Sequence, residues 1–438
     1  MTKHCAAAFL LIALLFSVSF SFGQNTQPAP SSNAASQQTQ VPDRYSLPPD
    51  KLTRATTLYR TELRMFALST IYSLALLWLL LRFGIAVRFR DSAERISPRF
   101  FVQAVIVIPL ILLAIRVAEL PLSVFWHHTG LVYGLSVQSW PSWFIDWCKG
   151  TTIQIFVGTF LCYGVYKLMR RSPRLWWLWI WIISIPLTIF AVWIVPIALD
   201  PMFNKFAPLE KTNPALVQQL TRVAQKGGLD IPPSRMFEMK ASEKVTTYNA
   251  YVTGVGSSKR IVVWDTTERE MTTPETLFIF GHEMGHYVLD HIWKGIAFST
   301  VLTLFGILLA RSLLLWSLRR KGDFWGLRAF DDLAGLPLLL LIASILSFVS
   351  MPIDSTISRY FEHEADVYGL EVTHGINDNS PEVAATSFQK LGEKSLNYPD
   401  PNPLYVFWSY NHPTISDRLK YALRYRPWEQ QRPLQYMK

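Results

Sequence analysis

The chain has 438 residues, of which half are hydrophobic and only 17% are charged. Soluble globular domains contain about 25% charged residues, so this composition excludes an ordinary soluble protein and indicates one that is integral to a lipid bilayer. The net charge of +10 does not indicate a nucleic-acid partner, because the basic residues lie in loops between apolar segments and not on one soluble domain.

The first apolar segment covers residues 5–22. Lys3 precedes it, and Ser21, Phe22 and Gly23 provide a small-x-small cleavage site, so residues 1–23 are either a secretory signal peptide or a first transmembrane helix. The residues after this segment are rich in Gln, Ser, Asn, Ala and Pro. This composition predicts a disordered linker over residues 24–60.

Six further apolar segments are long enough to cross a bilayer, which requires about 20 helical residues. They cover residues 65–87, 101–120, 151–169, 175–199, 292–316 and 333–353. Four of them fall in a first membrane region, residues 61–200, and two in a second, residues 292–354. With the N-terminal segment, they predict a mostly α-helical bundle of about seven spans.

The connections between these spans differ in basic residues. Residues 82–99, 167–174 and 317–331 contain five, four and four Lys or Arg, whereas residues 122–150 contain only Lys149. Basic loops face the cytoplasm, so we expect an integral, multi-pass membrane protein. Residues 201–291 and 355–438 would then lie on the extracytoplasmic side.

A small soluble module precedes the fifth of these six spans. Residues 212–226 have helical spacing and end at two glycines, while residues 249–254 and 259–265 predict a β-hairpin. An exposed strand of this hairpin could pair with an extended peptide by strand addition. A purely structural hairpin is the alternative.

The strongest chemical signal lies in residues 278–291, FIFGHEMGHYVLDH. His282 and His286 are four residues apart, so on a helix they lie on one face and can share a metal ion, with Glu283 beside it as a general base. The alternative is a buried helix that carries two histidines by chance. Because the flanking residues predict one long helix without an internal proline, the metal site is the better interpretation.

A third protein donor is required, because catalytic zinc takes three protein ligands and keeps a fourth position for water. The best source is residues 357–366, ISRYFEHEAD, directly after the last span. From spacing alone, Glu362, His363, Glu364 and Asp366 all remain candidates.

Two charged residues inside a predicted span support a different function. Arg116 and Glu119 lie three apart near the end of the second long span. Ionisable residues at membrane depth usually face a bundle interior or a wet cavity, so the pair would suit a membrane transporter or channel. A pair at the end of the helix that reaches the headgroups is an equal alternative, and neither residue is expected to be catalytic.

Several separated motifs resemble the integral-membrane zinc endopeptidases that comprise the CAAX prenyl protease type 1 and its bacterial relatives, with HtpX as a more distant cousin. The resemblance covers roughly residues 60–430. It is carried by residues 201–206 (PMFNKF), 249–251 (NAY), 281–286 (GHEMGH), 358–366 (SRYFEHEAD) and 409–413 (SYNHP), together with Arg418.

The resemblance implies one Zn²⁺ per chain, held by His282, His286 and Glu362. Glu283 matches the general base, and Asp366 matches an acid that orients a ligand histidine. His282, Glu283 and His286 also have the spacing of the metal-binding motif described above, whereas spacing alone does not select Glu362.

Other positions receive roles only from the resemblance. His412 and Arg418 match the pair that stabilises the oxyanion. Asn249, Ala250 and Tyr251 match the strand that lines the substrate cleft. His291, His363 and Glu364 match no family role and are expected on helix surfaces.

The resemblance also implies a fold and a substrate class. The expected fold is a bundle that encloses a chamber, with a small α+β zinc metalloprotease domain formed by residues 201–291 and 355–438. The resemblance implies that the membrane is a bacterial inner membrane. The expected partners are the bilayer and membrane-associated, lipidated or misfolded protein substrates, with the active site on the cytoplasmic side by family analogy. A proteolytically inactive quality-control scaffold is the alternative.

Overall fold

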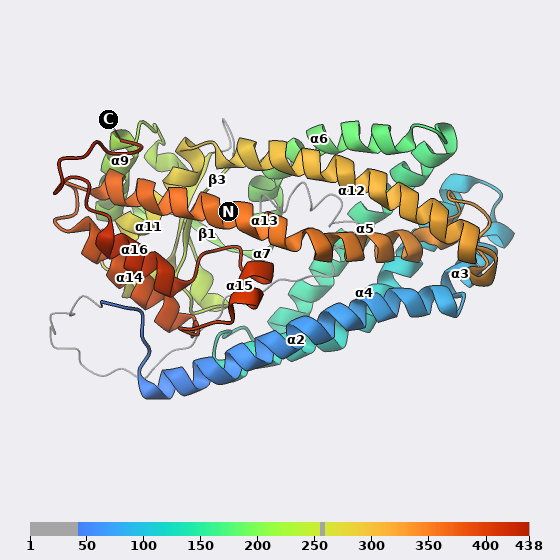
Figure 1. The fold of residues 1–438 in the computed structure, drawn as a ribbon, viewed down its shortest axis with the longest axis horizontal. Coiled ribbons are helices and arrows are strands. Elements are labelled where there is room, and N and C mark those ends of the chain that lie inside the picture. The colour runs from blue at the N-terminus through green and yellow to red at the C-terminus, as the bar shows by residue number, and fades with distance from the viewer. Residues whose placement is uncertain (1–42, 255–258, 438) are drawn as a thin grey trace.

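The computed structural model describes residues 43–254 and 259–437 (Figure 1). The segment expected to be a signal peptide or first span, and the linker as far as residue 42, lie outside the described residues. Within the described part, six helices are long and apolar enough to cross a membrane.

These six helices correspond to the six predicted spans. They are α2 (Pro49–Arg82), α4 (Phe100–Tyr133), α5 (Trp140–Arg171), α6 (Trp176–Ile194), α12 (His291–Lys321) and α13 (Leu336–Thr373). A π-helical turn, Val195–Leu199, and α7 (Asp200–Phe203) extend α6. The predicted fold class, a mostly helical multi-span bundle with a small α+β domain, is therefore confirmed.

The start of α2 corrects the predicted linker. The predicted linker includes residues 49–60, but they form the first turns of α2, with Pro49 at the helix start and Ala55 and Leu58 buried. Both side chains pack into the core of the soluble domain. This tertiary packing stabilises the helix, although the local sequence is polar.

The other end of α2 also differs from the predicted span, which extends to residue 87. Gly84 adopts a left-handed conformation with φ of 60° and breaks the helix, and α3 (Ile85–Ile96) starts after it. The first span therefore ends at Arg82.

The soluble domain contains a four-stranded sheet with the order β1-β2-β4-β3. Its strands are β1 (Phe206–Pro208), β2 (Met236–Met239), β3 (Ala250–Thr253) and β4 (Arg260–Trp264). The predicted hairpin is confirmed, because β3 and β4 pair antiparallel with Tyr251 opposite Val262. The first two strands were not predicted, and β2 runs parallel to β4.

The soluble domain also contains seven short helices within the described residues. They are α8 (Leu209–Thr212), α9 (Pro214–Lys226), α10 (Asp265–Glu270), α11 (Thr273–Val288), α14 (Ser380–Lys394), α15 (Pro403–Ser409) and α16 (Ile415–Arg424). The core beneath them includes Leu220, Ile261, Phe278 and Phe388. Segments from before and after the last two spans thus share one core.

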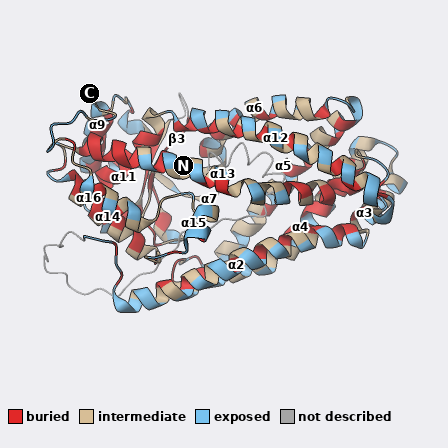
Figure 2. Cartoon of the chain, in the orientation of Figure 1, coloured by how far each residue is buried: buried red, intermediate tan, exposed pale blue. Residues whose placement is uncertain are grey.

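Burial along the membrane helices is one-sided (Figure 2). Large apolar side chains such as Phe305 and Val349 are 64% and 61% exposed. A water-soluble protein rarely exposes apolar surface on this scale, whereas a bilayer covers it at no cost. Between α5, α6, α12 and α13 lies an apolar cavity of about 270 Å³.

The three basic connections meet at one end of the bundle, and the sheet lies at the other (Figure 1). Arg90 in α3 pairs with Asp332 at 2.5 Å, and Arg170 at the end of α5 pairs with Asp331 at 3.0 Å. Both aspartates belong to the connection between α12 and α13. These ion pairs bring the three loops together.

Two membrane helices lead directly into the soluble domain. Helix α12 starts at His291, only five residues after His286. Helix α13 continues without interruption from the bundle through Glu362 and Asp366 to Thr373. The segments with the strongest sequence motifs are therefore fixed to the bundle.

Candidate metal centre

Helix α11 places the two histidines of the HExxH motif. A capping box between Thr272 and Glu275 starts the helix, which satisfies backbone N–H groups that would otherwise lack partners. His282 and His286 lie one turn apart on the same face. Both are buried, and their Nε2 atoms lie 3.2 Å apart.

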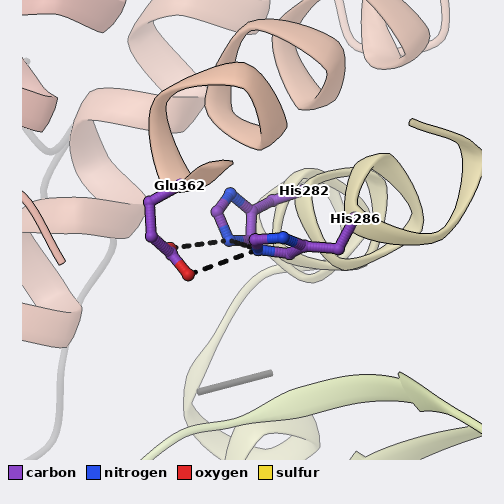
Figure 3. Close-up of side chains that lie close together, drawn as sticks. All are labelled: His282, His286 and Glu362. Carbon is purple, nitrogen blue, oxygen red and sulfur yellow. Dashed lines mark hydrogen bonds and ion pairs between the residues drawn. The ribbon is translucent and has the colours of Figure 1, made fainter. Parts of the chain in front are cut away.

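The third member of the cluster is Glu362 from α13 (Figure 3). Its Oε2 lies 3.3 Å from Nε2 of His282, and its Oε1 lies 3.3 Å from Nε2 of His286. The donor atoms of the three residues all fall within 4.8 Å of one another, and all three side chains are buried. Of the four candidates left open by the sequence, Glu362 is the one that joins the two histidines.

Small residues allow α11 and α13 to approach closely. A Cβ atom on Gly281 would lie 2.8 Å from Val372, and one on Gly369 would lie 2.9 Å from the backbone nitrogen of His282. A Cβ atom on Gly285 would lie 3.1 Å from Cα of Ala365. The glycines therefore set the separation at which a carboxylate on one helix meets imidazoles on the other.

A carboxylate and a guanidinium support His282. Asp366 Oδ1 lies 2.8 Å from His282 Nδ1, and Arg418 donates to both Asp366 oxygens, at 2.9 and 2.6 Å. Burial lowers the pKa of His282, but its bonds with Asp366 and Glu362 outweigh burial and raise that pKa to about 9. Asp366 thus holds the imidazole with Nε2 directed at the cluster.

The contacts of Arg418 differ from those expected of an oxyanion donor. Its guanidinium forms a bidentate pair with Asp366, and Nη2 also lies 3.3 Å from Nδ1 of His282. The bidentate geometry fixes a carboxylate firmly. Arg418 thus lies beside both Asp366 and His282, and its Nη2 is 3.8 Å from Oε2 of Glu362.

His412 lies on the open side of the cluster, in the connection between α15 and α16. Its Nε2 is 3.3 Å from Glu362 Oε1, and its Nδ1 is 2.7 Å from the side-chain oxygen of Asn411. Burial lowers the pKa of His412 to about 4, so the ring is neutral at pH 7. About a third of the side chain is exposed, which leaves it accessible to a substrate.

His291 was expected on a helix surface, and that prediction is wrong. The side chain is completely buried. Its Nδ1 lies 3.0 Å from Nδ1 of His286, and its Nε2 lies 3.1 Å from Glu364. Glu364 is therefore also part of the site, whereas His363 is exposed and packs against Tyr421.

The remaining predicted residues lie on two elements. Glu283 is half-buried in α11, and its Oε2 is a buried atom without a hydrogen-bond partner in the described part of the chain. Ala250 and Tyr251 belong to β3, and Asn249 precedes it. Ala250 is completely buried, so its backbone, and not its methyl group, is what a peptide could contact.

The donor set fits a catalytic metal ion. Two imidazole nitrogens and one carboxylate, with room for a water, are the ligands typical of zinc hydrolases. Oε2 of Glu283 is buried without a hydrogen-bond partner among the described residues, and Oε2 of Glu362 is a buried atom with the imidazole of His282 3.3 Å away. A cation and its water would satisfy these two atoms.

A His-His-Glu cluster on two closely packed helices, joined to a membrane bundle, is typical of a membrane-bound metallopeptidase. Comparisons with known proteins agree. Residues 210–426 match the model of peptidase family M48, and residues 32–205 match the CAAX prenyl protease N-terminal domain, described as five membrane helices.

Two relatives match most of the chain. The chain is 35% identical over 347 residues to the uncharacterized metalloprotease YhfN of Bacillus subtilis, covering 79% of each chain. It is 27% identical over 326 residues to CAAX prenyl protease 1 of Saccharomyces cerevisiae, covering 69% of this chain and 68% of that one. The chain belongs to peptidase family M48.

A solved structure supports the same fold. The crystal structure of S. mikatae Ste24p superimposes with a TM-score of 0.73 at 24% identity, over 96% of this chain and 95% of that one. The expected bundle that encloses a chamber is thus the fold of this chain. The protein is a multi-pass membrane metalloendopeptidase, and neither the inactive scaffold nor the transporter is favoured.

Proposed function

We propose that His282, His286 and Glu362 bind one zinc ion per chain, and that the protein cleaves membrane-associated, lipidated or misfolded proteins at this site. The observation that carries the proposal is the convergence of three buried donors from two helices. The relatives named CAAX prenyl protease 1 support a lipidated substrate.

Each residue around the ion has a separate task in the proposed reaction. When bound, zinc polarises the peptide carbonyl and lowers the pKa of water. Glu283 takes a proton from the attacking water and returns it to the leaving amine. His412 would donate from Nε2 to the developing oxyanion, an interaction that is typically worth about 3 kcal/mol. In the neutral ring this requires Nδ1 to accept from the amide nitrogen of Asn411, which a flip of that side chain brings to the position of its oxygen.

The backbone of β3 would align the substrate. Among the described strands, β3 pairs only with β4 and forms one edge of the sheet. An extended peptide can add to this edge antiparallel, next to helix α11. The backbone of Asn249 is already bonded to Thr267 and Trp264, which leaves its side chain for the substrate.

The test uses the purified full-length chain in detergent, loaded with zinc. Cleavage of casein and of a prenylated peptide would be measured with and without a chelator. We expect chelator-sensitive cleavage that Glu283→Gln abolishes while zinc remains bound. Cleavage by zinc-loaded Glu283→Gln at the parent rate would refute the assignment of the general base.

We infer that the catalytic domain faces the extracytoplasmic side of the inner membrane. The inference is supported by the ion-paired basic loops at the opposite end of the bundle, since such loops stay in the cytoplasm. A reporter fused after Lys438 tests it. Activity of a reporter that works only in the cytoplasm would reverse the orientation and agree with the family analogy.

A further inference from the structure

His286 has its own chain of supporting side chains, separate from the pair that supports His282. For Nε2 of His286 to face a metal, the ring proton must be on Nδ1. That nitrogen lies 3.0 Å from Nδ1 of His291. Nδ1 of His291 therefore accepts a hydrogen bond from Nδ1–H of His286, and His291 must carry its own proton on Nε2.

Glu364, the next residue in this series of hydrogen bonds, requires a proton on Nε2 of His291. Nε2 of His291 lies 3.1 Å from Oε2 of Glu364, and a carboxylate can only accept. The ring of His291 stacks on Phe361, with centroids 4.4 Å apart and planes 12° apart. Complete burial and this stacking hold the imidazole in one orientation.

This series of hydrogen bonds ends in the C-terminal tail. The hydroxyl of Tyr436 donates to Oε1 of Glu364 at 3.0 Å. The tail is held by Glu371, which is completely buried and accepts from the backbone N–H groups of residues 435, 436 and 437 at 2.6, 2.7 and 3.1 Å. Tyr425 donates to the same carboxylate at 2.5 Å.

We infer that His291, Glu364 and Tyr436 are positioning residues that fix metal ligand His286 through one directional line of hydrogen bonds. The C-terminal tail is thereby part of the metal centre, although it lies 150 residues after His286 in the sequence. This inference rests on the proposed function, since it requires that His286 binds the ion.

Zinc affinity is the direct readout. Competition with a chromophoric chelator would be measured on the purified full-length protein, with Zn²⁺ as the only added metal. Loss of an outer partner of a ligand histidine typically weakens metal affinity by about 10- to 100-fold. We expect this loss for His291→Phe, which keeps the aromatic ring stacked on Phe361 but removes the nitrogens.

Variants of Glu364 separate a hydrogen bond from packing. Glu364→Gln keeps an oxygen that accepts from His291 and should retain most of the affinity, whereas Glu364→Leu should lose about 10-fold or more. Tyr436→Phe removes one hydrogen bond and should weaken binding by about 2- to 10-fold. His363→Phe, at an exposed neighbouring position, is the matched control and should bind as the parent does.

A double-mutant cycle tests the connection itself. Because Glu364 acts through His291, Glu364→Leu should have no further effect on zinc affinity in the His291→Phe background. Additive losses, or a His291→Phe variant with parental affinity, would overturn the inference while leaving the proposed function intact. A parent protein that binds no zinc, or that binds it equally after His286→Ala, would overturn both.

Discussion

Gly369 of α13 faces the backbone of His282 of α11, and a Cβ atom at Gly369 would lie 2.9 Å from the backbone nitrogen of His282. Backbone cannot move aside as a flexible side chain can. The two helices must therefore separate if any larger residue replaces this glycine, and separation would move Glu362 away from the two histidines.

The Gly369→Ala variant should accordingly be less stable and bind zinc more weakly. Overpacking of a close contact typically costs about 1–3 kcal/mol. Thermal unfolding in detergent and chelator competition would measure both effects. Gly164→Ala is the control, since a Cβ atom there meets nothing within 4 Å, and equal behaviour of the two variants would show that the helix contact is not tight.

Removal of Glu362 should remove the metal. Glu362→Ala leaves two imidazoles as protein donors, and a catalytic site requires three. Inductively coupled plasma mass spectrometry should find less than about one-tenth of the parental zinc after gel filtration. A full zinc content in Glu362→Ala would mean that another side chain takes its place.

Substitution of Arg418 should lower zinc affinity, whereas substitution of His412 should lower kcat. Since Arg418 supports His282 through Asp366, Arg418→Leu should weaken zinc affinity by about 10-fold or more. His412→Phe should lower kcat by about 100-fold at saturating zinc, with zinc affinity close to that of the parent. Kinetics and chelator competition on the same preparations would distinguish the two roles, and a reversed pattern would exchange them.

Glu268 in α10 should make stability depend on pH. Burial raises its pKa to about 7, above the unfolded value near 4.5, so the folded state binds more protons between these limits. Below pH 4.5 Glu268 is neutral in both the folded and the unfolded state, and its burial carries no penalty. As the pH rises through 7 the buried carboxyl must ionise, and the free energy of unfolding falls. Glu268→Gln should therefore unfold at a higher temperature than the parent at pH 8, on the order of 2 °C, and not at pH 4.5.

The control for Glu268 is an exposed glutamate of the neighbouring helix α8. Glu210→Gln should shift the unfolding temperature equally, if at all, at both pH values. A Glu268→Gln difference that is the same at pH 4.5 and pH 8 would contradict the assignment of the titrating group.

Chelation should lower the unfolding temperature of the parent and leave that of Glu362→Ala unchanged. A ligand present at 100 times its Kd stabilises the folded state by about 2.7 kcal/mol. Differential scanning fluorimetry with and without chelator would measure this shift. An equal shift in both proteins would mean that the chelator acts on something other than the His-His-Glu cluster.

Local sequence patterns predict the membrane helices and the metal helix. Long apolar segments indicate the six spans, and the spacing of His282 and His286 indicates the metal helix, because both signals depend on residues close in the chain. The pairing of β2 with β4 is not predicted, because it joins strands more than 20 residues apart and no turn signal marks β2.

His291 shows why the rest of the site was not predicted. Its position five residues after His286 does not share a helix face with that residue. The chain turns at Asp290, which adopts a left-handed conformation with φ of 57°, and α12 starts in a new direction. The only signal in the sequence was a third histidine close to the motif. Its contact with His286 depends on the turn at Asp290, which the sequence pattern does not predict.

Helix α13 runs unbroken from the bundle into the metal centre. It therefore fixes the distance between the metal centre and the membrane helices, which a substrate anchored in the same bilayer must span. Glu362 lies nine positions after Ile353, the last residue of the apolar segment, which corresponds to about 14 Å of helix. An extended polypeptide needs about four residues to cover that length. If Ile353 marks the hydrocarbon edge and α13 stands upright in the bilayer, we expect peptide bonds fewer than about four residues from that edge to escape cleavage.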